Sequence, residues 1–311
     1  MKLPLLFKEY IWLVETIYQA RRITFAELNK RWKENGISAG NPLSRTSFNR
    51  HRSAILDMFG LIIECDRKDG YCYYIENPET LNENTVQNWM YSTLSVGNIL
   101  DENIGIQHRI LLESIPSGND KLKQITTAMR ENRCVSITYR KYGMTESNTF
   151  CAAPYCIKLF KRRWYVLVKK EKSGSENKNE HLFAIYSLDR VEKIKVIQTK
   201  FEMDEGFDAA SYFNDSFGVM VAKNIKVARI VLRTYGKEQY YMRDLPLHHT
   251  QREIKATEEY TDFEIKIRPT ADFKAHLLSR GEWIQVVEPA WLVAEMKELM
   301  YDTIKRYENT I

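Results

Sequence analysis

The sequence predicts an α+β multidomain protein, and three observations lead to that class. The chain has 311 residues, a length typical of two or three domains of about 100–200 residues each. Helical periodicity followed by a hairpin pattern fills residues 1–80, whereas short β-forming segments dominate residues 119–203. Residues 219–311 alternate strand and helix patterns. We therefore expect three folded domains, with residues 81–118 as a helical connector after the first.

The overall composition is that of an ordinary globular protein. Apolar residues make up 44% of the chain and charged residues 28%, which excludes a wholly disordered chain, a collagen-like chain and a small disulfide scaffold. No apolar run approaches the roughly 18–20 residues that cross a bilayer, and the apolar part of MKLPLLFKEY is too short for a signal peptide. The cysteines are odd in number, so we expect reduced thiols in a cytoplasmic protein. They are Cys65, Cys72, Cys134, Cys151 and Cys156.

Positive charge is concentrated in two segments. The net charge is only +5, but residues 21–52 hold eight Lys or Arg against two acids, and residues 158–172 hold seven against one. Residues 81–120, which lie between them, hold five acids and one Arg. Two basic patches on different domains suggest two sites for polyanions, and two solvated surfaces are an equally simple alternative.

Two helices are predicted at the start of the chain. Apolar residues recur at helical spacing over residues 7–20. A capping box then begins a second helix over residues 24–35, with Thr24 at the N-cap and Glu27 at the third helical position. Leu28 occupies the hydrophobic-staple position and should be buried.

A third helix and a hairpin complete the N-terminal domain. Ser44 is the predicted N-cap of this helix, and Gly60 ends it. Residues 61–77 then predict two strands joined by a turn at residues 67–70. Three helices followed by a β-hairpin is the element order of a winged helix-turn-helix, in which the third helix enters the DNA major groove.

The third helix has one apolar face and one polar face. At 100° per residue, Phe48, Ile55 and Phe59 fall within about 20° of one direction, which predicts a buried stripe. The opposite face carries side chains that can read base edges, and the hairpin tip carries cations that can touch the DNA backbone or minor groove. Arg52 lies near the buried stripe, so its stem should pack there and its head should reach a phosphate. We therefore predict DNA contacts by Arg45, Thr46, Ser47, Asn49, Arg50, Arg52, Arg67 and Lys68. The alternative is a winged helix that makes only protein contacts.

A small β-barrel is predicted in the middle of the chain. Residues 121–132 predict a helix, and five short strands follow between residues 134 and 197. One helix with about five strands in so short a stretch suggests a barrel of the SH3 or Sm type. Residues 81–118 are too apolar for a flexible linker, so we expect a connector that packs against the barrel or pairs two chains.

The C-terminal part predicts a small ferredoxin-like α/β domain. After a loop over residues 204–218, the patterns give the order β-α-β-β-α-β, followed by a long amphipathic helix over residues 290–307. Thr270 is the predicted cap of the second helix in this order, and Gly281 is its predicted end.

At this point three motifs resemble one family. APYCIKLFKRRWYVLVKK and the later IYSLDRV resemble the core of the WYL domain, which has a Pro-containing strand, a strand with Trp-Tyr-Leu and a later Leu-Asp-Arg. The chain departs from the signature because Val166 stands before Leu167. RGEWIQVVEPAWLVAEMKEL resembles the extension that often follows WYL domains, and the N-terminal helices match the winged helix that accompanies them. The chain is thus similar to WYL-domain transcription regulators over nearly its whole length.

The resemblance implies a function and a ligand site. It implies a bacterial transcription regulator, usually dimeric, whose Sm-like WYL domain senses a ligand that is often a nucleotide or nucleic acid. Several relatives repress anti-phage defence systems. Trp164 of the signature is expected in the core. For Arg190, an ion pair with a neighbouring acid is as good an expectation as ligand binding. The residues expected to bind the ligand are Tyr139, Arg140, Lys158, Arg163, Tyr165 and Arg190.

We therefore predict a ligand-responsive, DNA-binding transcription regulator, acting as a repressor. Its expected partners are a double-stranded DNA operator, a nucleotide or nucleic-acid effector and a second copy of the chain, with no membrane. The alternative is an RNA- or single-strand-binding protein that uses the barrel as its effector surface. An enzyme is not expected, because the sequence has no Walker loop, GxSxG elbow or HExxH motif. No cofactor or metal is expected, since the cysteine spacings do not fit a zinc site.

Overall fold

The computed structural model is a mixed α/β protein with several antiparallel sheets. It divides into two compact units, residues 1–113 and 114–311, which we describe separately. The structure describes residues 4–35, 39–68, 70–82, 85–102, 119–171 and 181–308.

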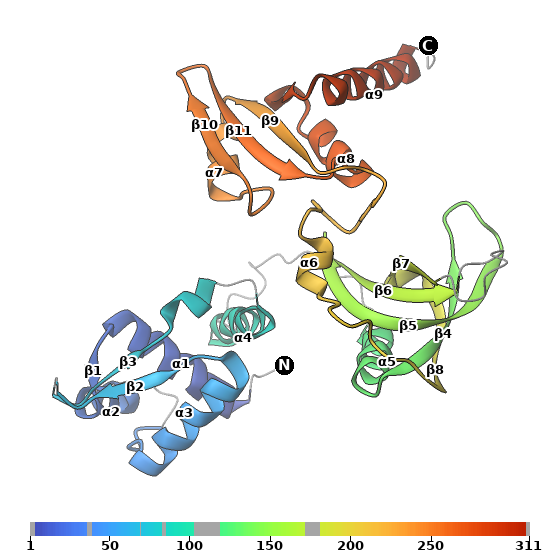
Figure 1. The fold of residues 1–311 in the computed structure, drawn as a ribbon. Helices are drawn as coiled ribbons and strands as arrows, with labels where there is room; N and C mark the ends of the chain where they lie inside the picture. Colours follow the sequence, from blue (N-terminus) through green and yellow to red (C-terminus); the bar gives the residue numbers. More distant parts are fainter. Residues whose placement is uncertain are drawn as a thin grey trace. The chain divides into compact units, whose positions relative to one another are not determined.

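The first unit begins with the three helices and the hairpin that the sequence predicts, and with a two-residue strand, β1, that it does not predict (Figure 1). Its strands form one antiparallel sheet in the order β1-β3-β2. The elements are α1 (Leu5–Ala20), β1 (Ile23–Thr24), α2 (Phe25–Glu34), α3 (Arg45–Phe59), β2 (Ile63–Asp66) and β3 (Cys72–Ile75).

Local hydrogen bonds explain where α2 and α3 begin and end. The Thr24 side chain accepts a hydrogen bond from the Glu27 amide at 3.2 Å, so the predicted N-cap is confirmed. The Glu27 carboxylate, which is the other half of the predicted capping box, instead accepts a hydrogen bond from the Arg31 side chain at 2.8 Å. Ser44 caps α3, and Gly60 ends it with a left-handed φ of 68° that glycine adopts without strain.

A fourth helix packs on α1 and α3. The predicted stripe of Phe48, Ile55 and Phe59 is buried in the core of this unit. A short 3-10 helix, η1 (Pro78–Asn82), leads to α4 (Val86–Glu102), whose Tyr91 ring meets Phe59 edge to face at 5.4 Å. Helix α4 also packs against α1, a placement that the sequence analysis did not predict. The rest of the predicted connector, residues 103–118, lies outside the described residues.

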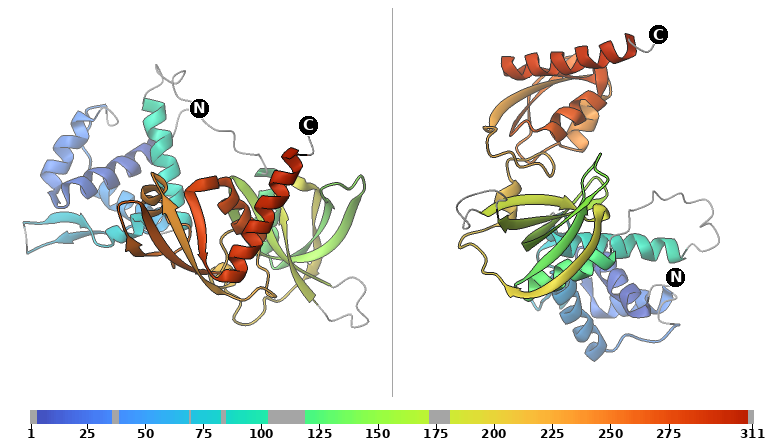
Figure 2. Two further views of the ribbon diagram at one scale, coloured as in Figure 1. Left: turned by 90° about the horizontal axis from the view of Figure 1, so that it is seen from above. Right: turned by 90° about the vertical axis from the view of Figure 1, so that its right-hand side faces the viewer.

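The second unit opens with a helix and a curved five-stranded sheet (Figures 1 and 2). The strand order is β7-β6-β5-β4-β8, all antiparallel. Among the described strands β7 and β8 are edges that do not pair with each other, so the predicted closed barrel is not observed. The elements are α5 (Asn119–Arg130), β4 (Arg133–Arg140), β5 (Ser147–Phe160), β6 (Arg163–Glu171), β7 (His181–Ser187), the 3-10 helix η3 (Leu188–Arg190) and β8 (Val191–Lys200).

Strand β5 holds this sheet together. It pairs with β4 through its first half and with β6 through its second half, and its register shifts between Pro154 and Cys156. Helix α5 contributes Ile125 to the core, where it joins Ile137 of β4 and Val166 of β6. Trp164 is half-buried against the same core, as the sequence analysis predicted.

The rest of the second unit has the predicted order β-α-β-β-α-β-α. Its four strands form an antiparallel sheet in the order β10-β11-β9-β12, with α8 and α9 contributing Phe273 and Leu292 to its core. The elements are α6 (Ala209–Phe213), which falls in the predicted loop, then β9 (Ala228–Tyr235), α7 (Glu238–Asp244), β10 (Arg252–Ala256), β11 (Tyr260–Ile267), α8 (Ala271–Ser279), the 3-10 helix η4 (Gly281–Trp283), β12 (Ile284–Glu288) and α9 (Ala290–Glu308).

Candidate nucleic-acid interface and ligand pocket

The outward face of α3 is polar and open to solvent. Because the apolar stripe holds the opposite side of the helix in the core, the face that the sequence analysis assigned to DNA is left free. Arg45, Thr46, Asn49 and Arg50 are exposed, and Ser47 is partly exposed. These side chains therefore form one accessible surface, rich in hydroxyl, amide and guanidinium groups that can bond to base edges or phosphates.

Two arginines on this face, Arg45 and Arg50, each make one weak contact with a neighbouring side chain. The Arg45 guanidinium carbon lies 4.7 Å from the centre of the Phe25 ring. Arg50 donates to the Ser47 hydroxyl at a long distance of 3.4 Å. Both contacts are weak and exposed, so either head group can turn to an incoming phosphate or guanine at little cost.

Arg52 is placed differently from its neighbours. Its guanidinium donates to the carbonyl of Ile63, with Nε at 2.8 Å, and lies 5.5 Å from the centre of the Tyr73 ring. Glu64 lies 3.7 Å from the same group. The predicted packing of its stem is present, but the head group is engaged on the hairpin and ties α3 to β2 and β3.

The hairpin tip carries the remaining predicted cations. Arg67 and Lys68 are exposed, and the Lys68 amide donates to the Asp66 carboxylate at 3.0 Å, which shapes the turn. Arg22, which follows α1, pairs with the same carboxylate at 3.0 Å and so holds the last residue of β2 beside the turn. Arg67 and Lys68 therefore lie on a turn whose first residues are held by two contacts to the Asp66 carboxylate.

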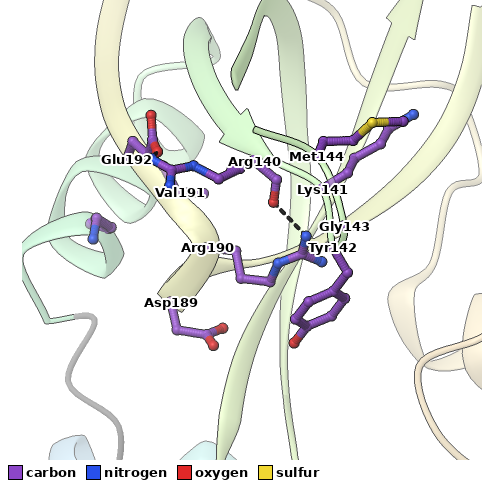
Figure 3. Close-up of a pocket in the computed structure, with 10 residues that line it drawn as sticks. Arg140, Lys141, Tyr142, Gly143, Met144, Asp189, Arg190, Val191 and Glu192 are labelled. Carbon is purple, nitrogen blue, oxygen red and sulfur yellow. Dashed lines mark hydrogen bonds and ion pairs between the residues drawn. The ribbon is translucent and has the colours of Figure 1, made fainter. Parts of the chain in front are cut away.

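A second candidate site is a polar pocket in the second unit, at the ends of β4 and β8 (Figure 3). Its volume is about 490 Å³, and more of its lining side chains are cations than anions. Such a pocket suits an anionic ligand. It is lined by Lys121, Arg140, Lys141, Tyr142, Gly143, Met144, Asp189, Arg190, Val191 and Glu192.

Arg190 is the best-positioned cation in this pocket. Its guanidinium carbon lies 3.4 Å from the centre of the Tyr142 ring and 4.9 Å from that of Tyr139. The same group donates to the Arg140 carbonyl (Figure 3). The buried Tyr139 hydroxyl lies 3.4 Å from the Ser187 hydroxyl, which fixes the second ring. Among the residues that the structure describes, Arg190 has no ion-pair partner, so the predicted alternative is not observed there.

Two further arginines complete the charge arrangement. Arg163 donates to the Tyr142 hydroxyl at 2.9 Å and pairs with Asp189 at 3.1 Å, and the hydrogen bond to Tyr142 is the main cause that raises its pKa. Arg140 pairs with Glu192. The Ser147 hydroxyl donates to Glu192 at 2.7 Å and, together with Arg140, lowers the pKa of that carboxyl. Glu192 therefore remains ionised, and each of the two acids holds an arginine in place.

Of the predicted ligand residues, Arg140 and Arg190 line this pocket, whereas Tyr139 and Arg163 only contact residues of its lining, and Lys158 and Tyr165 have other neighbours. Tyr165 lies on β6, paired with Lys158 on one side and Ser187 on the other, and neither predicted ligand residue lines the pocket. The Lys158 ammonium donates to the carbonyl of Gly218 at 2.7 Å and lies 4.2 Å from the Phe213 ring. Burial lowers its pKa. Its partner is thus the chain segment that follows the sheet.

Residues 217–220 of that segment pack closely between β5 and α8, and we call this contact region the joint. The amides of Val219 and Met220 both donate to the Asp272 carboxylate of α8, at 3.1 and 3.2 Å. Gly218 has no room for a side chain, because a Cβ there would collide with Asp272 and come within 2.7 Å of the Phe160 ring. Close packing therefore holds the segment between β5 and α8.

Sequence reasoning missed several pocket residues. Tyr142 lies in a turn between two strands, and nothing local in the sequence marks its ring as the platform for Arg190. Asp189 belongs to the Leu-Asp-Arg motif, but only the arginine was singled out. Lys121 comes from the start of α5, far from the signature in sequence.

Other chemistry has little support in the residues that the structure describes. No group of three or more His, Cys, Asp or Glu is placed to hold a metal ion there. His248 is half-buried, and its ring forms hydrogen bonds with the Thr250 hydroxyl at 2.8 Å and the Asn214 carbonyl at 2.7 Å. All five cysteines are free. No described helix is both long enough and apolar enough to cross a bilayer.

Comparisons with known proteins agree with the resemblance noted above. A model of the WYL domain matches residues 120–196, and a model of the WCX domain matches residues 226–302. No curated protein matches the chain.

Two solved structures show distant similarity. Proteasome accessory factor B/C (PafBC) of Arthrobacter aurescens aligns at 14% identity and a TM-score of 0.37, over 93% of this chain. The chain spans only 45% of that protein. A CRISPR Cas-related protein aligns at 12% identity and a TM-score of 0.38, over 86% of this chain and 75% of its own. These scores are too low for either similarity to support a function.

Proposed function

Since this chain is a WYL-domain protein in which a WCX domain follows the WYL domain, we propose that it is a DNA-binding transcription regulator controlled by an anionic ligand. The observation that carries the proposal is the outward face of α3, where Arg45, Thr46, Asn49 and Arg50 are all exposed while the opposite face is buried.

The N-terminal elements support a winged helix-turn-helix that reads double-stranded DNA. Helix α3 would lie in the major groove, where its exposed side chains reach base edges and phosphates. The β2–β3 hairpin would be the wing, with Arg67 and Lys68 at the DNA backbone. Arg52 would act indirectly, by fixing the angle between helix and wing. Phosphate contacts would supply much of the affinity and make it dependent on salt.

The domain division follows from the same proposal. Residues 1–80 would form the DNA-binding domain and residues 81–118 the connector. Residues 119–203 would form the WYL domain as an open, Sm-like sheet, and residues 219–311 a ferredoxin-like WCX domain. Helix α4 packs on the first domain, so the connector would include part of its core.

The effector would be a nucleotide or a short nucleic acid bound in the pocket beside Arg190. The pocket offers guanidinium groups for phosphates and the Tyr142 ring for a base or ribose face. Such a ligand can change DNA binding only if it binds the DNA-competent and DNA-incompetent states with different affinity. We propose repression as the sign of the regulation, a homodimer as the active species, and control of an anti-phage defence locus as its setting.

Fluorescence anisotropy tests the proposal. A labelled duplex from just upstream of the protein's own gene is titrated against a scrambled duplex at several salt concentrations. Tighter binding to the native duplex, with affinity that falls steeply as salt rises, is the expected result. Equal and weak binding of both duplexes would count against sequence-specific DNA binding at that site.

The second candidate is an RNA- or single-strand-binding protein that uses the five-stranded sheet. The cation-rich pocket favours it, since Arg190 and Tyr142 suit a single strand as well as a nucleotide. Under that function, replacing Arg190 would abolish binding, whereas replacing Arg50 would leave it unchanged. An enzyme is not proposed, and turnover of any nucleotide above background in a hydrolase assay would reopen that question.

A further inference from the structure

A pocket lies at the start of α3, next to the face proposed to read DNA. Its volume is about 440 Å³, and residues of α1, of α2 and of the loop before α3 also line it. Ser47 and Arg50 belong both to this pocket and to the outward face of α3. A duplex read by that face would therefore bring its backbone to the mouth of the pocket. The lining residues are Leu5, Glu9, Trp32, Asn41, Pro42, Leu43, Ser44, Ser47, Arg50 and His51.

The polar side chains of this pocket can donate hydrogen bonds to an anion. The Ser47 hydroxyl oxygen accepts from the Ser44 hydroxyl at 2.9 Å and from Arg50 at 3.4 Å, so its own proton remains available. Asn41 adds a side-chain amide. Helix α3 has 15 residues and no acid in its first turn, so no carboxylate there offsets the positive end of the helix dipole. Such a set of donors suits a phosphate group.

His51 lies in the wall of the same pocket with an unsatisfied ring nitrogen. The residue is 9% exposed, and its ring centre lies 5.3 Å from that of Tyr10 and 6.3 Å from that of Trp32. Nδ1 is buried and has no hydrogen-bond partner in the described part of the chain. Nε2 lies 3.6 Å from the Glu9 carboxylate, beyond ordinary hydrogen-bond distance. Buried polar atoms without partners are rare, and one in a pocket wall points to a group that binds there.

The surroundings of His51 keep its ring neutral in the protein without DNA. From α1 the ring meets Glu9 and Tyr10, from α2 it meets Trp32, and Arg50 precedes it on its own helix. Burial lowers the pKa of His51 from 6.5, and the guanidinium of Arg50 lowers it further. Burial also raises the pKa of Glu9 and of Tyr10. A phosphate that enters this pocket adds a negative charge beside a neutral imidazole, and that charge favours the imidazolium form.

We propose that this pocket binds one backbone phosphate of the duplex and that His51 takes up a proton from solvent when the phosphate enters. The inference rests on the proposed DNA-binding function, to which it adds one contact and one proton. The imidazolium supplies a cation in the pocket wall, and the hydroxyl of Ser47 and the amide of Asn41 supply hydrogen bonds. Arg50 remains available for the bases, because these other groups hold the phosphate.

The direction of the pH dependence follows from the same charges. The free protein protonates His51 only below its lowered pKa, whereas the phosphate raises the pKa of that ring in the complex. Between the two values the complex holds more protons than the separate molecules, so affinity rises as pH falls and levels off below both. We expect binding about three- to tenfold tighter at pH ~5.5 than at pH ~7.5.

Fluorescence anisotropy of the full chain over that pH range measures this dependence. The probe is a labelled DNA duplex of about 20 base pairs at low salt, where phosphate contacts that do not depend on sequence are strong. His51→Gln should lose the rise in affinity at low pH, whereas Glu9→Gln should retain it. His249→Gln is the matched control, since His249 is an exposed histidine of the second unit, and it should behave as the wild type. Circular dichroism at each pH establishes that every variant is folded.

Calorimetry on the wild type provides a measurement that needs no variant. Binding of the same duplex is titrated at pH ~6 in buffers that differ in their enthalpy of ionisation. The observed enthalpy changes with the buffer in proportion to the number of protons exchanged, and we expect a net uptake of part of one proton.

Three results would overturn the inference and leave DNA binding standing. One is a duplex that binds without proton uptake. Another is a His51→Gln variant with the pH dependence of the wild type. The third is a Glu9→Gln variant that loses the dependence, since the carboxyl group would then be the one that titrates. Absence of duplex binding at every pH would instead overturn the proposed function, and this inference with it.

Discussion

Tyr142 positions two arginines at once. The guanidinium of Arg190 lies over its ring at 3.4 Å, and Arg163 donates to its hydroxyl at 2.9 Å. One cation thus meets the face of the ring and the other meets its hydroxyl. A single tyrosine in a turn thus sets the shape of the proposed effector site.

Replacing Tyr142 should therefore weaken ligand binding in two steps. Tyr142→Phe keeps the ring under Arg190 and removes only the hydrogen bond to Arg163. Tyr142→Ala removes both and should bind a single-stranded DNA oligonucleotide about two- to fivefold more weakly than Tyr142→Phe, since an exposed cation–π contact contributes roughly 0.5–1 kcal/mol. Isothermal titration calorimetry measures the difference. Equal affinity of the two variants would show that the Arg190 stack does not contribute.

Arg50 and Lys68 should affect DNA binding in different ways. Arg50→Ala should reduce discrimination between the native and scrambled duplexes by about 1–3 kcal/mol if the arginine makes a bidentate base contact. Lys68→Ala should weaken binding to all duplexes alike and lower the salt slope by about one. Anisotropy at several salt concentrations separates the two effects. An Arg50→Ala variant that discriminates as well as the wild type would refute base reading by this residue.

Arg52 should matter for stability as well as for DNA binding. Arg52→Ala removes the hydrogen bond to the Ile63 carbonyl and the contact with Tyr73, so the free energy of unfolding should fall by about 1.5–3 kcal/mol. Arg50→Ala on the same helix is the control and should change it by less than about 0.5 kcal/mol. Urea unfolding measures both. If the two variants have the same free energy of unfolding, the contact of Arg52 with the hairpin does not stabilise the fold.

Gly218→Ala should loosen the joint between β5 and α8. The added methyl group would meet the Phe160 ring at 2.7 Å and collide with Asp272, so we expect a loss of about 1–3 kcal/mol in the free energy of unfolding. Phe160→Leu in the same chain makes room on one side and should recover part of this loss. A Gly218→Ala protein as stable as the wild type would mean that the segment can move aside.

The stability of the first unit should fall as the solution becomes acidic. Burial lowers the pKa of His51 from its usual 6.5, and nearby Arg50 lowers it further. As pH falls through 6.5, the unfolded chain takes up a proton that the folded chain resists, so stability is lost between that value and the lower folded pKa. Glu9, 3.6 Å from His51, has a pKa raised by burial and acts in the opposite direction at lower pH, toward 4.5.

His51→Gln provides the measurement for that dependence. Its free energy of unfolding should change less than that of the wild type between pH ~7.5 and ~5.5, because the titrating ring is gone. Glu9→Gln in a parallel series isolates the opposing contribution. Identical slopes for His51→Gln and the wild type would assign the acid sensitivity to other groups.

The parts of the fold that depend on local sequence could be predicted. Ser44 and Thr24 cap their helices through bonds to amides three residues away, and Phe48, Ile55 and Phe59 are buried because their spacing places them on one face. Such signals need no knowledge of the rest of the chain, which is why the order of strands and helices followed from them.

The parts that depend on contacts distant in sequence could not be predicted. Lys158 lies near the WYL signature, yet it bonds to Gly218, sixty residues later in the chain. The guanidinium group of Arg52 donates a hydrogen bond to the Ile63 carbonyl on β2 instead of lying in solvent. Closure of a barrel depends on whether the two edge strands meet, and β7 and β8 carry no sequence signal for that.

Strand β5 has a consequence for the timing of local opening. One end holds Ser147 against Glu192 in the pocket wall, and the other holds Lys158 at the joint with Gly218. Backbone pairing, first with β4 and then with β6, spans the strand between these ends with one register shift, between Pro154 and Cys156. Amide hydrogens along such a strand exchange with solvent through shared opening events. A ligand that slows exchange beside the pocket should therefore also protect the far end of the strand, even though it touches nothing there.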